Sequence, residues 1–269
     1  MKKQSVILRL LLVLSIAAVL ITATGFFREL HIIRQGRSFY ADMLAGIETR
    51  PRGQDYQDAE GHRDAGGSAE PLQADTAIAQ WVPYVDFELL NEAYPGIVAW
   101  IRLEGTNIDY PVMQYTDNDY FMSRLPDGTV HRSGSIYLDY RNNSDFSDKS
   151  ILIYGHMSSA QEMFAPLDNY RDQDFYDANP VIYLHTPHKD YVIVLFAGYL
   201  AHSERDHPPL YFWGDEAFLN YVEGLKDISL FSSDVAVGTD DIIVSLCTCA
   251  YDFDEARLVI AGILAEIQS

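Results

Sequence analysis

The chain has 269 residues, 48% of them hydrophobic, so it can bury a core of normal size. Its formal net charge of −20 argues against a nucleic-acid binder, because neutralising phosphates requires a basic face. The 18 Tyr, 13 Phe and 3 Trp, many of them in short alternating runs, favour β structure. We therefore expect an acidic, mainly β protein with no nucleic-acid partner.

The first part of the chain is expected to cross a membrane. Residues 10–27 form an uncharged apolar run long enough to span a bilayer. No small-residue cleavage site follows the run and no cysteine nearby can carry a lipid, so we predict an uncleaved, single-pass anchor. Basic residues flank the run almost equally on both sides. Because long domains translocate largely regardless of charge, we place the acidic body outside the cell membrane.

Three parts are predicted along the chain. Residues 1–27 form the cytoplasmic tip and the transmembrane anchor, and residues 28–76 form a juxtamembrane helix, from 28 to about 48, followed by a flexible linker. Residues 50–75 are polar, Gly-rich and poor in aliphatic side chains, so they cannot bury enough apolar surface to order themselves. Residues 77–269 have the length of one folded domain.

Within that domain, the pattern predicts many short strands with helices inserted between them. Segments 181–186 and 191–200 read as a hairpin around a Pro-containing turn. The elements do not alternate regularly enough for a parallel βαβ sheet, so the predicted fold is mainly β, a closed β-barrel with inserted short helices behind an N-terminal transmembrane helix. The expected helices are 83–92, 160–169, 172–178 and 215–226, and the expected strands are 97–103, 108–114, 134–138, 150–154, 181–186, 191–200, 241–248 and 257–264.

The chain has only two cysteines, Cys247 and Cys249. A secreted disulfide scaffold would carry more, spread along the chain, and a bridge between positions i and i+2 of one strand would be strained. The pair therefore either carries out chemistry or consists of two small buried hydrophobic residues. Their position alone favours neither interpretation. Because Ser245, Cys247 and Cys249 share one face of the strand, alternation does not tell which thiol is the nucleophile.

Two more candidate residues lie at strand ends. His156 follows the apolar strand 150–154, where its ring can reach out of a barrel. Arg257 follows the short loop 250–256, which could return the chain antiparallel and place Arg257 beside Cys249. Each has a plainer interpretation, since a lone histidine is more often a satisfied structural residue and an arginine after an acidic loop typically pairs with it at the surface.

Together these patterns resemble the sortase family of cysteine transpeptidases. Residues 245–249 read Ser-Leu-Cys-Thr-Cys, similar to the family signature Thr-Leu-x-Thr-Cys that a strand-borne arginine follows. Tyr-Gly-His-Met at 154–157 looks like the catalytic histidine segment. Ser245 in place of Thr and the second thiol of Cys247 depart from the signature. The resemblance covers residues 80–269, and its class B features are segments 105–112, 117–120 and 134–142 and the helix 215–226.

The resemblance implies a sortase-like barrel and a set of roles. Cys249 is the expected nucleophile, which forms a thioester with a C-terminal sorting signal of secreted proteins. His156 is the acid and base, and Arg257 stabilises the oxyanion or holds the peptide. The acyl group would pass to an amine of peptidoglycan or of its lipid-linked precursor. Three further residues are expected to contact substrate: Tyr211, Cys247 and Thr248.

Other functions remain open from the residues. A cysteine peptidase or amidase would use the same pair, but papain-like enzymes place Cys before His and on a helix N-terminus. An L,D-transpeptidase would need Cys-x-Arg spacing, whereas Arg257 lies eight positions after Cys249. A non-catalytic surface-anchored binding domain would not need Cys249, His156 and Arg257 together. No metal or cofactor is expected, because the cysteines lack the paired spacing of zinc motifs.

The same residue types predict a slow enzyme. If the thiol and the imidazole titrated independently, the thiolate–imidazolium pair would be under roughly 1% of the protein at pH 7. Cys249 ends a strand, so it also lacks the helix dipole that lowers the pKa of a papain-type cysteine. A pH–rate profile with a high plateau from about pH 5 to 7 would contradict this prediction.

Overall fold

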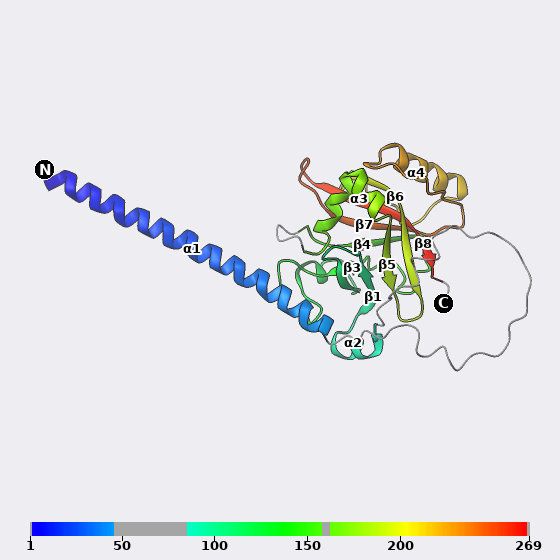
Figure 1. Ribbon diagram of the computed structural model, residues 1–269, viewed down its shortest axis with the longest axis horizontal. Coiled ribbons are helices and arrows are strands. Elements are labelled where there is room, and N and C mark those ends of the chain that lie inside the picture. Colours follow the sequence, from blue (N-terminus) through cyan, green and yellow to red (C-terminus); the bar gives the residue numbers. More distant parts are fainter. Residues whose placement is uncertain (1, 46–84, 158–161, 268–269) are drawn as a thin grey trace, which may run out of the picture.

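A long helix and a β-barrel make up the described residues, 2–45, 85–157 and 162–267, of this computed structural model (Figure 1). The strands close into a barrel in the order β1-β2-β3-β4-β7-β8-β6-β5. Two neighbouring pairs, β2–β3 and β4–β7, are parallel and the others are antiparallel. The predicted fold class is confirmed. The strands are β1 (Ile97–Arg102), β2 (Asp109–Met113), β3 (Ile136–Leu138), β4 (Ser150–Tyr154), β5 (Val181–His185), β6 (Asp190–His202), β7 (Ile243–Cys249) and β8 (Ala256–Glu266).

The helices are short except for the first and fourth. Helix α2 begins after Asp86, whose side chain accepts a hydrogen bond from the Leu89 backbone N–H and so caps the helix. The α-helices are α1 (Lys2–Ala45), α2 (Phe87–Ala93), α3 (Gln173–Ala178) and α4 (Asp215–Asp227), and the 3-10 helices are η2 (Phe121–Ser123) and η3 (Ala165–Arg171).

The helix predicted at 160–169 is confirmed only for its second half, which forms the 3-10 helix η3. Residues 160 and 161 lie outside the described residues, and the chain is not helical until η3 begins at Ala165. The Phe164 backbone N–H donates to the His156 carbonyl, and Met163 has a φ of 55°. The bond pairs this segment with the end of β4, the left-handed Met163 turns the chain, and Pro166 then lies in the first turn of the 3-10 helix.

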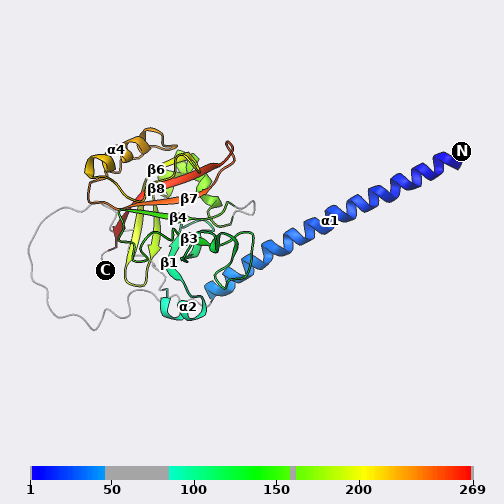
Figure 2. The same ribbon diagram turned by 180° about the vertical axis from the view of Figure 1, so that it is seen from behind.

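Helix α4 explains why β7 is apolar on both faces. One face of the barrel wall points to the interior, where Leu246 packs with Ile153 and Ile260. The other face carries Cys247 and Ile243, which pack in one buried cluster with apolar residues of α4, the helix at the top of Figure 2. Two buried faces give a continuous hydrophobic run in place of alternation.

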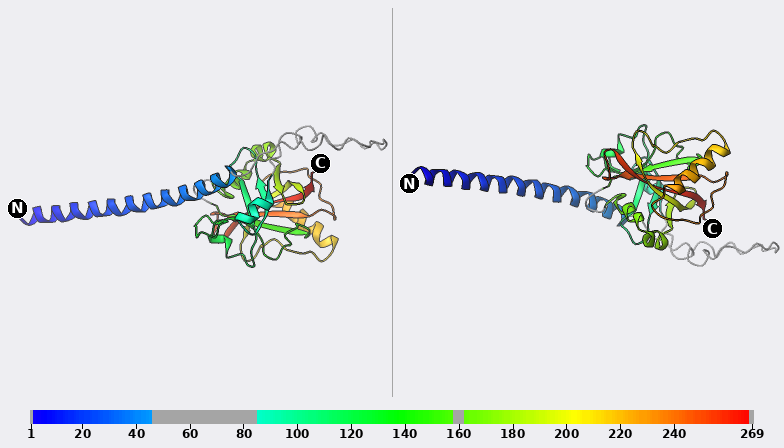
Figure 3. Two further views of the ribbon diagram at one scale, coloured as in Figure 1. Left: turned by 90° about the horizontal axis from the view of Figure 1, so that it is seen from below. Right: turned by 90° about the horizontal axis from the view of Figure 1, so that it is seen from above.

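Helix α1 projects from the barrel on the side away from α4 (Figures 1 and 3). From Leu11 onward it is long and apolar enough to be a candidate membrane span. The predicted juxtamembrane segment is not a separate helix, because residues 28–45 continue α1. This last part docks on the barrel, where Tyr40 is buried against Tyr110. The linker predicted after residue 48 lies outside the described residues, and the three-part division of the chain stays a prediction.

Candidate active site

Strand pairing brings the three predicted catalytic residues together. The parallel β4–β7 pair sets Tyr154 opposite Cys247, so His156, just past the end of β4, lies beside Cys249 at the end of β7. In the antiparallel β7–β8 pair, Cys249 lies opposite Arg257. The end of β4, the end of β7 and the start of β8 therefore meet at one rim of the barrel. They line a cavity of about 120 Å³ with Met122, Tyr137, Tyr154, Gly155, Cys247 and Thr248.

The Cys249 and His156 side chains interact across the rim. This interaction lowers the pKa of the half-buried Cys249 thiol against the opposing effect of burial, and the nearby Arg257 charge lowers this pKa further. The same interaction raises the pKa of His156, again against burial. The lowered pKa of the thiol and the raised pKa of the imidazole both make the thiolate–imidazolium pair more populated than it would be if the two groups titrated independently. The prediction of a slow enzyme remains untested.

A backbone carbonyl orients the imidazole. His156 Nε2 lies 2.8 Å from the Met122 carbonyl oxygen in η2, and because a carbonyl only accepts, Nε2 carries a proton. Nδ1 is then the nitrogen left for the Cys249 thiol. Sequence reasoning did not find Met122, since a main-chain acceptor carries no residue-type signal.

Arg257 lies half-buried beside Cys249 and keeps local partners. Its Nη1 donates to the Ala256 carbonyl at 2.9 Å, and its Nη2 lies 3.5 Å from Glu255 Oε2. The expected surface pairing with the acidic loop is therefore realised in part. An exposed pair of this kind contributes little, so the guanidinium can turn toward a bound carbonyl at small cost.

The structure distinguishes the two thiols. Cys247 is buried in a hydrophobic cluster that includes residues of α4, and burial raises its pKa to about 12, so this thiol stays neutral near pH 7. Cys249 is half-buried with a lowered pKa, which makes it the better nucleophile. Alternation along the strand leaves the choice of nucleophile open, and the burial of Cys247 against the half-exposed position of Cys249 favours Cys249.

The predicted substrate contacts are only partly assembled. Cys247 and Thr248 line the cavity beside Cys249, although both are buried. Tyr211 is 67% exposed, stacks edge-to-face on Trp213 and is not among the residues that line this cavity. Their contacts with substrate stay predictions. In the described part of the chain, no group of three or more His, Cys, Asp or Glu side chains could hold a metal ion.

Comparisons with known proteins agree with this geometry. Sortase B of Listeria monocytogenes is 35% identical over 179 residues, which cover 66% of this chain and 72% of that protein. The chain belongs to the sortase family, in class B. A Staphylococcus aureus sortase B–substrate complex matches with a TM-score of 0.64 and 28% identity over 68% of this chain and 85% of that one.

A further solved sortase B, complexed with triglycine, matches equally well. Its TM-score is 0.64 and its identity 29%, over 68% of this chain and 86% of that one. No family model matches the chain. The segment around Cys249 thus resembles the sortase signature, and most of the barrel shares the fold of the solved sortase B structures.

We expect alkylation of Cys249 by iodoacetamide to persist to lower pH than alkylation of an ordinary thiol. A lowered pKa keeps the thiolate populated as the pH falls, so the half-maximal rate moves down. In His156→Ala the interaction with the imidazole is lost while burial remains, so the midpoint should rise. Mass spectrometry of the labelled peptide measures both curves. An unchanged midpoint in His156→Ala would show that the imidazole does not control the thiol.

Proposed function

We propose that the chain is a membrane-anchored transpeptidase that uses Cys249, His156 and Arg257 to cut and rejoin a peptide bond. The placement of Cys249, His156 and Arg257 around one cavity, with the pKa of the thiol lowered and that of the imidazole raised by their interaction, carries this proposal. Membership of the sortase family supports the reaction class.

The reaction has two halves. Cys249 Sγ attacks a carbonyl carbon of the sorting signal, and Arg257 stabilises the negative charge that develops on the carbonyl oxygen. His156 gives its proton to the leaving amine, and a thioester remains on Cys249. An incoming amine then attacks the thioester and gives a proton to His156, which restores the thiolate–imidazolium pair.

The proposed substrates are supported by the relatives. A substrate complex of S. aureus sortase B supports a peptide acyl donor, and the triglycine complex supports a glycine amine as acceptor. We propose a C-terminal sorting signal of secreted proteins as donor and an amine of peptidoglycan or its lipid-linked precursor as acceptor. The apolar part of α1 would hold the enzyme at the cell membrane, with residues 77–269 as the extracellular catalytic domain.

The test is a partition experiment on the full chain in detergent. A quenched peptide library carrying Pro-x-Thr motifs is incubated with and without triglycine, and products are identified by mass. We expect a cleaved donor joined to triglycine when the amine is present. Cleavage that yields only the free acid at all triglycine concentrations would instead identify a hydrolytic peptidase, and no cleavage of any peptide would contradict the proposed donor class.

A further inference from the structure

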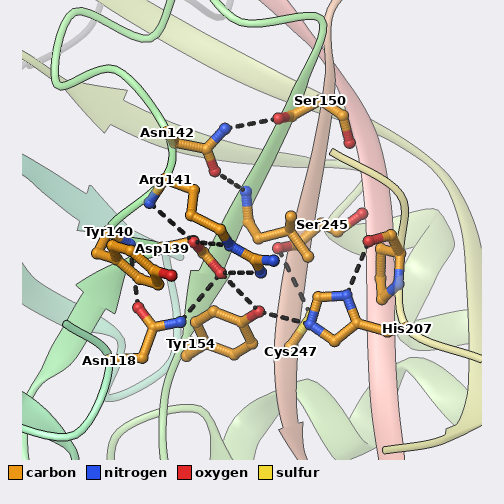
Figure 4. A network of polar contacts seen from close by, with 12 residues as sticks. Asn118, Asp139, Tyr140, Arg141, Asn142, Ser150, Tyr154, His207, Ser245 and Cys247 are labelled. Atoms are coloured by element: carbon orange, nitrogen blue, oxygen red, sulfur yellow. Dashed lines mark hydrogen bonds and ion pairs between the residues drawn. The ribbon is translucent and has the colours of Figure 1, made fainter. Parts of the chain in front are cut away.

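A second polar network lies beside the catalytic residues and centres on Asp139 (Figure 4). The Asp139 side chain is buried and accepts bonds of 2.8 Å from both Nε and Nη2 of Arg141 and of 3.0 Å from Asn118. Burial alone would raise the pKa of Asp139, but the bonds from Arg141 and Asn118 outweigh burial and lower it to about 2. The carboxylate is therefore charged at neutral pH and can only accept hydrogen bonds.

Tyr154 extends this network to the active site. Its hydroxyl lies 3.1 Å from Asp139 Oδ2, and its ring stacks on Tyr137 with 5.3 Å between centroids. Tyr154 is the last residue of β4, two positions before His156, and it lines the cavity beside Cys249. A group that fixes the Tyr154 side chain therefore acts on the wall of the proposed active site.

His207 extends the network beyond Tyr154. Its Nε2 lies 2.8 Å from the Tyr154 oxygen and its Nδ1 lies 2.9 Å from the Pro208 carbonyl oxygen. Tyr154 has one proton, which Asp139 accepts, so the Tyr154 oxygen must accept from Nε2. The Pro208 carbonyl must accept from Nδ1. All these bonds form together only when both ring nitrogens of His207 carry protons, and either neutral tautomer loses one of them.

His207 belongs to the β6–α4 loop, residues 203–214. This loop covers a second cavity, of about 60 Å³, which shares Tyr154, Cys247 and Arg257 with the cavity beside Cys249. The His207 ring is exposed, so it exchanges protons with solvent. The titratable or charged groups around it are His202 of β6, Asp206 of the loop, Tyr154 of β4, Cys247 of β7 and Arg257 of β8, with Asp139 behind Tyr154.

We propose that His207 is a positioning residue that fixes the β6–α4 loop against the active-site wall through Tyr154 and Asp139, fully so only when both its ring nitrogens are protonated. Histidine changes charge near neutral pH, so the loop should loosen as the pH rises. The effect on donor binding rests on the proposed function, because the loop borders the groove where the donor peptide would lie.

The first test does not depend on activity. Hydrogen exchange of the full chain in detergent, read by mass spectrometry, gives protection factors for residues 203–214 at about pH 5.5 and 8 after correction for intrinsic exchange. We expect about threefold higher protection at the lower pH, the size expected for one partly exposed hydrogen bond. His207→Gln keeps a donor in place of Nε2–H but cannot gain charge, so the difference should vanish.

Two variants make this test specific. Tyr154→Phe removes the hydroxyl, leaves the ring on Tyr137, and should also abolish the pH difference. His188→Gln changes an exposed histidine in the β5–β6 turn and should retain the difference. Protection of β7 residues 243–249 reports whether each variant is folded. Equal protection of the loop at both pH values in the unchanged protein, or a difference that persists in His207→Gln, would overturn the proposal.

The second test uses a peptide cleaved in the library experiment. At about pH 6, His207→Gln should raise the KM for that donor about threefold and leave kcat within about twofold, since His207 positions the wall and does not touch the reacting atoms. At about pH 8 the two proteins should converge. A loss confined to kcat would contradict a positioning role. Failure of the library to yield a substrate would affect the proposed function and leave the exchange result to decide this inference.

Discussion

Cys249→Ala is expected to reduce cleavage of the donor peptide by about four orders of magnitude or more, because the acyl-enzyme can no longer form. The fold should be unaffected, since Cys249 is only half-buried at the end of β7. Cleavage rates and a thermal unfolding curve on the same preparations separate the two effects.

Cys247→Ala is the matched control for this prediction. It removes a buried thiol that lies two residues away on the same strand face and lines the same cavity. We expect a loss of activity below about tenfold and of stability by about 1 kcal/mol, from a small cavity. A larger loss of activity in Cys247→Ala than in Cys249→Ala would reverse the assignment of the nucleophile.

Gly134→Ala is expected to give the second-largest loss of cleavage rate, because Gly134 lies against the Met122 carbonyl that orients His156. Gly134 has a φ of 54°, and an added Cβ would lie 2.7 Å from the Phe121 carbonyl oxygen and closer still to that of Met122. Displacing the Met122 carbonyl removes the acceptor for His156 Nε2. A misplacement of this kind costs about 10²-fold in rate, and we expect a stability loss of about 3 kcal/mol.

Gly105→Ala is the matched control, because it introduces backbone strain without a steric clash. Gly105 also has a positive φ, 70°, but nothing lies within 4 Å of its added Cβ. Its stability should fall by only about 1 kcal/mol, and cleavage should be unchanged. Equal losses of activity in the two variants, measured as kcat on the full chain in detergent, would mean that the Met122 carbonyl does not position His156.

Helix α1 also bears on this part of the active site. The Tyr40 hydroxyl lies 3.3 Å from the Gly134 carbonyl oxygen, and Arg37 forms an ion pair of 2.7 Å with the buried carboxylate of Glu162. Gly134 precedes His156 in the sequence and Glu162 follows it, so α1 contacts the segments on both sides of His156. The end of α1 therefore packs beside the candidate active-site rim, a contact that the predicted division into anchor, linker and domain did not suggest.

Strands were predictable where apolar runs and turn residues agree. The strand expected at 150–154 coincides with β4, and the hairpin expected at 181–186 and 191–200 is the antiparallel β5–β6 pair. The helix expected at 160–169 begins only at Ala165, as a 3-10 helix, because the Phe164 backbone N–H bonds to the distant His156 carbonyl. Local propensity is a weak guide where such a contact decides the backbone path.

The candidate site divides in the same way. Side chains with distinctive chemistry at strand ends, Cys249, His156 and Arg257, could be named from the sequence, and strand register brings them together. The Met122 carbonyl and the Asp139–Tyr154–His207 network could not, because main-chain acceptors and surface histidines look ordinary until the fold places them.

The most direct test of the central claim is the mass of the enzyme during turnover. The full chain is mixed with a cleaved Pro-x-Thr peptide without amine, quenched in acid, and digested to locate any adduct. We predict an added mass equal to the acyl fragment on the peptide that contains residues 247–249, assigned to Cys249 and retained in Cys247→Ala. It should disappear within one turnover when triglycine is added. An adduct on Cys247, or cleavage that continues in Cys249→Ala, would contradict the account.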